Sequence, residues 1–256
     1  MSNIINRVLE RTIGFNLKRA RISCVNKIKG DPIYVEFVGV AGVGKTTLYK
    51  NVFREVKRNW RNIHELHRIF IDHSNGIATE SQLCYQFLAH NKMHSIGTRN
   101  LNGLDQMKLV KYFHSVLIAD SLVHLFNNDY NIISEEGIIH NFGEGLLLLS
   151  KNYSEEFDRL VKHRAVVYCY SSAEIVAKRI LEREKKTGRI LPQHKVDSFD
   201  ELVKLQEKSL EQKIKLLDFL KKYEIPFLSI DTSKPMIENV ETVKRFLANL
   251  TNYSKK

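Results

Sequence analysis

The sequence predicts an α/β fold with one parallel β-sheet covered by helices on both faces. Short apolar runs alternate with longer segments of helical periodicity between residues 33 and 250, and this alternation implies right-handed crossovers between parallel strands. A glycine-rich segment at residues 39–47 separates the first apolar run from the first helical segment. The 256 residues, of which 43% are hydrophobic, suffice for one domain with a sizeable core.

The first strand is expected at residues 33–38, a run of β-branched and aromatic side chains (IYVEFV). The first helix follows at residues 48–58, where Leu48, Val52 and Val56 share one face. Between them the chain satisfies the pattern GxxxxGK[ST], which is typical of a loop that binds nucleotide phosphates. The loop consists of Gly39, Val40, Ala41, Gly42, Val43, Gly44, Lys45, Thr46 and Thr47.

The residue types of this loop suit phosphate chemistry. Its glycines permit backbone angles and a close approach that a side chain would block. Successive N–H groups and the N-terminus of the following helix then offer partial positive charge to a bound phosphate. We expect Lys45 to reach the β- and γ-phosphates of ATP and the Thr46 hydroxyl to ligate Mg²⁺.

The remaining elements follow in alternation. Four more strands are expected, which gives five in total, at residues 63–72, 130–134, 165–170 and 225–230. Helices are expected at residues 105–126, 144–162, 172–186, 198–223 and 236–250. The fourth of these helices opens with a capping box, Ser198 to Glu201.

Two acids follow the strand at 130–134 and are expected at its carboxyl end, beside the phosphate-binding loop. Acids in this position orient Mg²⁺, which assigns Glu135 to the metal site together with Thr46. Glu136 would accept the proton of an attacking hydroxyl. The alternative for both is a solvated pair before the turn at Gly137.

Arginines gather after the strand at 165–170. Arg183 and Arg189 are expected to stabilise the charge on a transferring γ-phosphate, because a guanidinium has a planar fork of donors. Gly188 would supply backbone freedom for a closing segment. The alternative is a solvated helix face balanced by Glu182 and Glu184.

These features together resemble the P-loop nucleoside and nucleotide kinases, thymidylate kinase in particular, over residues 33–250. The resemblance rests on the loop at 39–47, the strand-end acids, the arginine-rich stretch and the Ser229-Ile230-Asp231 ending. It implies a three-layer P-loop kinase-like fold with strand order 2-3-1-4-5, an arginine-bearing lid at 179–195 and an adenine loop at 231–234. The sequence departs from thymidylate kinases by having Glu135-Glu136 in place of an Asp-Arg pair.

The net charge of +11 is concentrated at the N-terminus. Residues 1–30 carry seven lysines and arginines and one glutamate, a net of +6, and precede the kinase-like domain at 31–256. Such a segment suits an anionic membrane surface, a nucleic acid, or an arm that packs on its own domain.

The three cysteines, Cys24, Cys84 and Cys169, are far apart, and the polar start does not match a secretory signal, so a cytoplasmic protein is expected. We expect an ATP- and Mg²⁺-dependent kinase that phosphorylates a small-molecule acceptor (a nucleoside, a nucleotide or a sugar-like compound). A polynucleotide kinase and an NTPase switch with a protein partner are the competing functions. The oligomeric state stays open, a homodimer included.

Overall fold

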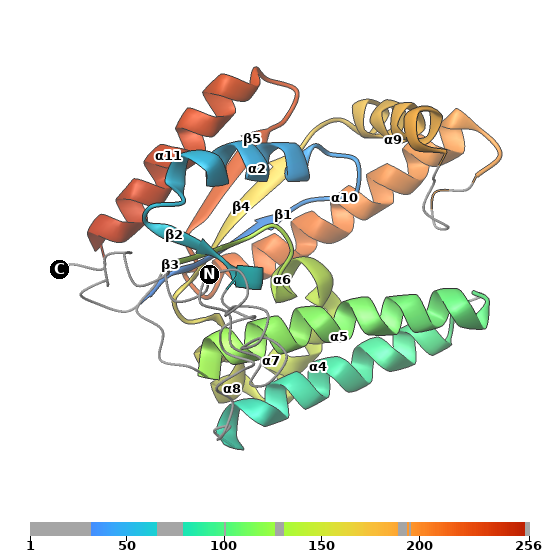
Figure 1. Cartoon of the computed structure of the whole chain (residues 1–256). Helices are drawn as coiled ribbons and strands as arrows, with labels where there is room; N and C mark the ends of the chain where they lie inside the picture. The colour runs from blue at the N-terminus through green and yellow to red at the C-terminus, as the bar shows by residue number, and fades with distance from the viewer. Residues whose placement is uncertain are drawn as a thin grey trace, which may run out of the picture.

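The structure is a computed structural model that describes residues 32–65, 79–99, 101–125, 131–188, 194 and 196–253 (Figure 1). The basic segment 1–30 lies outside the described residues, so its expected partners stay predictions.

Five parallel strands form one sheet in the order β2-β3-β1-β4-β5, which confirms the predicted fold class and strand order. The central strand β1 pairs with β3 on one side and with β4 on the other, so that Val35 lies between Ile133 and Ala165. The strands are β1 (Tyr34–Val38), β2 (Trp60–Asn62), β3 (Asn131–Ser134), β4 (Arg164–Tyr170) and β5 (Phe227–Asp231).

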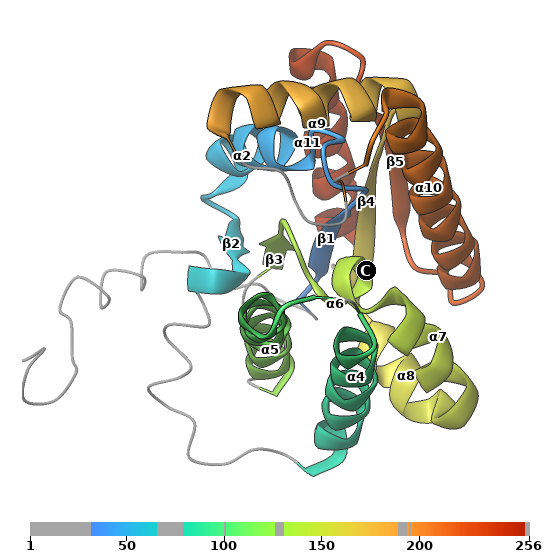
Figure 2. The same cartoon turned by 90° about the vertical axis from the view of Figure 1, so that its right-hand side faces the viewer.

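Helices cover both faces of the sheet (Figures 1 and 2). One face carries α2 (Lys45–Val56), α9 (Ala173–Thr187) and α11 (Met236–Tyr253). The other carries α4 (Thr79–Gly97), α5 (Gly103–Leu125), α6 (Ile138–Asn141), α7 (Gly143–Asn152) and α8 (Ser154–Val161). Helix α10 (Phe199–Lys221) contributes to both cores. Among the described helices, none combines the length and apolarity needed to cross a membrane.

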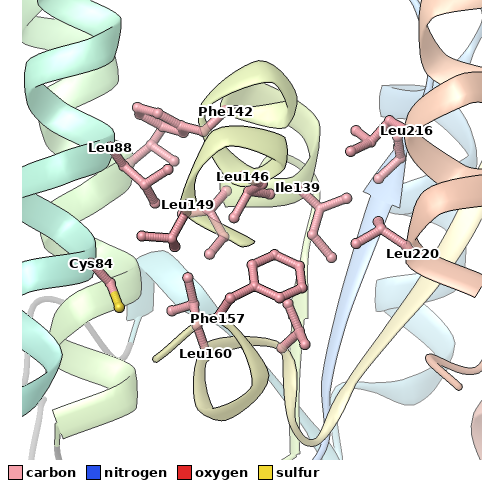
Figure 3. Close-up of a cluster of buried hydrophobic side chains, with 14 of the residues drawn as sticks. Cys84, Leu88, Ile139, Phe142, Leu146, Leu149, Phe157, Leu160, Leu216 and Leu220 are labelled. Atoms are coloured by element: carbon pink, nitrogen blue, oxygen red, sulfur yellow. The ribbon is translucent and has the colours of Figure 1, made fainter. Parts of the chain in front are cut away.

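Strand alternation divides the hydrophobic core into two clusters. In β4, Val167 and Cys169 face α2 and α9, whereas Val166 and Tyr168 face the helices on the opposite side. Figure 3 shows the cluster on the side of Val166 and Tyr168, where side chains from α4, α7, α8 and α10 interdigitate. The residues labelled there are Cys84, Leu88, Ile139, Phe142, Leu146, Leu149, Phe157, Leu160, Leu216 and Leu220.

The second strand lies earlier in the chain than predicted. The strand expected at 63–72 is wrong at its start, because β2 ends at Asn62 and residues 63–65 are helical; residues 66–72 lie outside the described part of the chain. The buried residue that fixes the strand is Trp60, which is 3% exposed and pairs with Asn131. Helix α4 was not predicted, because its apolar and polar residues do not follow a helical period in the sequence; Leu83, for example, is exposed, whereas Leu88 is buried.

A buried charge network joins the sheet to α4 and α5. Arg164 of β4 donates to Glu36 of β1 (2.8 Å) and to Asp120 of α5 (2.6 Å). The Tyr85 hydroxyl of α4 donates to the same Asp120 carboxylate (2.7 Å). All four side chains are buried. Burial raises the pKa of Glu36, and the Arg164 guanidinium opposes that rise.

Replacing Arg164 with methionine should therefore be strongly destabilising, because it leaves two buried carboxylates without their cation. We expect the Arg164→Met variant to lose about 3–5 kcal/mol of unfolding free energy in urea titrations. The exposed Arg54→Met variant on α2 is the control and should stay within about 0.5 kcal/mol of the parent. Equal stability of the two variants would show that the network contributes nothing to the fold.

Candidate functional site

The phosphate-binding loop lies between β1 and α2, where the sequence places it. Gly42 and Gly44 have φ angles of 88° and 100°, which only glycine adopts readily. A Cβ on Gly39 would lie 2.6 Å from the carbonyl oxygen of Cys169. Helix α2 begins at Lys45, so the free N–H groups of its first turn lie at the end of the loop.

Arg179 and Thr232 support this loop from outside it. The carbonyl of Val43 accepts hydrogen bonds from Arg179 Nη1 (2.7 Å) and from Thr232 Oγ1 (2.5 Å). Arg179 Nη2 also donates to the Thr232 carbonyl (2.9 Å). Arg179, expected at the start of a lid, is therefore a helical residue of α9 bound to the loop. Thr232 belongs to the segment expected to lie near adenine, so that segment and the phosphate-binding loop are in contact.

The two strand-end acids meet the loop, as predicted. Thr46 Oγ1 donates a hydrogen bond to Glu135 Oε1. Lys45 Nζ donates to the Glu135 carbonyl (3.0 Å) and to Glu136 Oε1 (3.2 Å). Lys45 is 6% exposed, whereas the Glu136 side chain is 35% exposed. The site thus has a buried ammonium, a hydroxyl and two carboxylates at one point.

Tyr112 of α5 is a site residue that sequence reasoning missed. Its hydroxyl donates to Glu136 Oε2 and lies 3.2 Å from Asn141 Oδ1. Burial and the Glu136 carboxylate raise the pKa of Tyr112, so it remains a donor at neutral pH. No sequence signal marks it, because it lies 24 residues from its partner on a different element.

The buried Glu36 positions the segment that carries these acids. Its Oε2 accepts hydrogen bonds from the N–H groups of Ile139 (2.9 Å) and His140 (3.3 Å) at the start of α6. A Cβ on Gly137 would lie 2.2 Å from the Glu36 carboxyl carbon. The turn after the acids therefore requires a glycine for its close approach to the carboxylate.

Two further lysines converge on the same segment. Lys92 of α4 donates to the Asn141 carbonyl (2.7 Å), and Lys213 of α10 donates to the His140 carbonyl (2.6 Å). Burial is the main cause that lowers the pKa of each lysine to about 8. Both line a cavity of about 800 Å³ whose wall includes loop residues 39–41.

The donor set at the acids fits a Mg²⁺ ion. Among the described residues, no three His, Cys, Asp or Glu side chains are grouped as a protein-only metal site would need. Mg²⁺ is instead usually held by one or two protein oxygens, with waters and phosphates completing its shell. The contact between the Thr46 hydroxyl and the Glu135 carboxylate supplies such oxygens beside the phosphate-binding loop.

Of the two arginines predicted to act from the lid, the structure describes Arg183 and not Arg189. Arg183 is exposed on α9, four residues beyond Arg179. Its charge lowers the pKa of His194, after the larger effect of burial. Arg189 lies outside the described residues. Their action on a phosphate stays a prediction.

Comparison with known proteins finds solved structures but no matching family model, and no curated protein matches the sequence. A shikimate kinase from Bacteroides thetaiotaomicron is 14% identical, with 84% of this chain and 98% of that chain covered and a TM-score of 0.43. A deoxyadenosine kinase from M. mycoides is 14% identical, with 85% of this chain and 100% of that chain covered and a TM-score of 0.40. A gluconokinase from Sinorhizobium meliloti 1021 is also 14% identical, with 89% of this chain and 96% of that chain covered and a TM-score of 0.37. Likeness at this level leaves activity and substrate to be inferred from the residues of the site.

The turn at Gly137 offers a direct test of this arrangement. Gly137→Ala forces a methyl group into the Glu36 carboxylate, and we expect it to lower the unfolding free energy by about 1–3 kcal/mol in urea titrations. The matched control is Gly103→Ala, since a Cβ at the start of α5 meets no atom within 4 Å. An unchanged Gly137→Ala protein would mean that the turn does not depend on its contact with Glu36.

Proposed function

We propose that the protein is an ATP- and Mg²⁺-dependent kinase that transfers the γ-phosphate to a hydroxyl of a small molecule. The observation that carries the proposal is the meeting of Lys45, Thr46, Glu135 and Glu136 beside a cavity of about 800 Å³. The phosphate-binding loop forms part of the cavity wall. A cavity of this volume suits a small ligand, and its position next to the loop favours transfer over simple hydrolysis.

Each residue has a definite task in this proposal. The loop amides 39–47 and Lys45 hold the β- and γ-phosphates, and Thr46 with Glu135 holds the metal. Mg²⁺, when bound, neutralises charge on the phosphates. Glu136 takes the proton of the acceptor hydroxyl, whose oxygen bonds to the γ-phosphorus. The bond between that phosphorus and the β–γ bridging oxygen breaks, and ADP leaves with this oxygen.

The surroundings of Glu136 support its task. Lys45 and Tyr112 each bind one of its oxygens, which fixes the carboxylate without burying it. It lies 4.0 Å from His140 Nε2, and His140 lines the cavity. An acceptor in the cavity would therefore lie next to both the base and the loop.

The contributions of Arg183 and Arg189, and the adenine contact at 231–234 that the resemblance to P-loop nucleoside kinases implies, belong to this proposal as well. Arg183 is one α9 turn from the residue that binds the loop. A closing segment beyond Gly188, where α9 ends in a left-handed conformation, would bring a guanidinium toward the γ-phosphate.

Lys45→Met should lower ADP formation at least about a hundredfold, because the variant lacks the charge that stabilises the transferring phosphate. The reaction is followed as ADP release with Mg²⁺ and a panel of nucleosides, nucleotides, sugars, sugar phosphates and short oligonucleotides. Lys50→Met, an exposed lysine on the same helix, is the control and should keep full activity. Full activity of a folded Lys45→Met protein would exclude both the kinase and an NTPase switch.

Glu136→Gln separates proton transfer from nucleotide binding. We expect kcat to fall about a hundredfold while ATP affinity, measured by titration, stays within about twofold. Glu241→Gln on α11 is the matched control, since Glu241 is exposed and its ion pair is with Lys244 of the same helix. Unchanged kcat in Glu136→Gln would remove the residue from the reaction, and ADP release without any acceptor would favour the switch.

A further inference from the structure

The cavity beside the phosphate-binding loop has a strong excess of positive charge. Its charged wall residues are Lys92, Arg99, Lys213 and Lys215 against the single acid Glu144. Burial lowers the pKa of Lys213, the charges of Lys45 and Lys92 lower it further, and the carboxylates of Glu36 and Glu136 oppose this in part. Ammonium groups that converge at one place repel one another unless an anion lies between them.

Buried polar atoms on the same wall lack partners. Within the part of the chain that the structure describes, His140 Nδ1, His194 Nδ1 and Gln206 Nε2 have no hydrogen-bond partner. Gln206 is 1% exposed and His194 is 5% exposed. These three nitrogens are themselves buried although their residues line the cavity, so a polar ligand reaches them only through a change of side-chain rotamer. Ser209 and Gln212 add further groups that hydrogen-bond to hydroxyls.

The wall offers little to a nucleobase. Phe113 is the one phenylalanine, tyrosine or tryptophan among the described residues that line the cavity. The Lys92 ammonium lies over its ring, 4.0 Å from the centroid, and so occupies a face on which a base would stack. The lining thus combines charged and hydrogen-bonding groups with apolar side chains such as Leu147 and Leu205, and its one aromatic ring is covered by a lysine.

We propose that this cavity binds the phosphate acceptor as an anionic polyhydroxylated compound, a sugar phosphate or a sugar acid, whose anion is held by Lys92 and Lys213. The proposal rests on the kinase function above and specifies its substrate class. The Ser209 hydroxyl and the Gln212 amide bind the hydroxyl groups, which orients one of them toward Glu136. The cavity then selects against neutral sugars, because they leave the lysines without a counter-charge.

Binding is measured by calorimetry on the full chain with ADP and Mg²⁺ present. The loop is then occupied by the phosphates of ADP and does not bind the probe. The probes are glucose 6-phosphate, gluconate, glucose and thymidine monophosphate. We expect one of the two sugar anions to bind at least about tenfold more tightly than glucose or the nucleotide. Which of them binds distinguishes a phosphate from a carboxylate as the recognised anion.

Substitutions of Lys92 and Lys213 test whether these two lysines bind the anion. Lys92→Met and Lys213→Met should each weaken the sugar anion about tenfold or more, as loss of a hydrogen bond to a charged group does. Lys208→Met, an exposed lysine on α10, should bind as the parent does. Should Lys213→Met fail to fold by circular dichroism, Lys213→Gln and Lys92→Met provide the same test.

Four results would overturn the inference: equal binding of glucose, tighter binding of the nucleotide, no binding by any probe, or undiminished binding in both lysine variants. ADP formation is measured in parallel with the same probes. Lysine-dependent binding without transfer would contradict the kinase function and leave the anion site standing. Transfer to a neutral acceptor would contradict the anion site and leave the kinase function standing.

Discussion

The carboxylate of Glu36 is the interaction on which the candidate site depends. It lies in the central strand at a position where a core residue would normally pack, and the Arg164 guanidinium opposes the rise in its pKa that burial causes. One of its oxygens binds that guanidinium, and the other accepts the first N–H groups of α6. A single buried charge thereby connects the sheet core to the segment 135–141. A buried ion pair of this kind adds little net stability but fixes one arrangement, since its partners cannot be left apart.

The segment 135–141 is the common contact of the other elements that form the candidate site. The phosphate-binding loop meets it through Lys45, α4 through Lys92 and α10 through Lys213, and each of these lysines donates to one of its carbonyl oxygens. Arg179 of α9 binds both the phosphate-binding loop, at the Val43 carbonyl, and the residue that follows β5, at the Thr232 carbonyl. The rigid parts of the site therefore come from elements far apart in sequence, and the sheet brings their ends to one edge, as parallel α/β folds do.

Local signals in the sequence were sufficient for the fold class and for the phosphate-binding loop. Strand β4 and helix α10 were predicted because an apolar run and a capping box are local patterns. Strand β2 was not, because it has three residues of which only Trp60 is buried, and helix α4 was not, because its apolar and polar residues do not follow a helical period. Glu135 and Glu136 could be placed from strand-end position alone, whereas Tyr112, Lys92 and Lys213 reach the site through tertiary packing that no local pattern records.

The dependence of the site on Glu36 is tested most directly by amide hydrogen exchange at Ile139 and His140. In the parent protein both amides should be strongly protected, because they donate to a buried carboxylate. In Glu36→Gln their protection should fall by at least about tenfold, while the amide of Phe37 in β1 stays protected by the sheet ladder. Equal protection of Ile139 and His140 in the two proteins would contradict the account, since the segment would then be held by something other than Glu36.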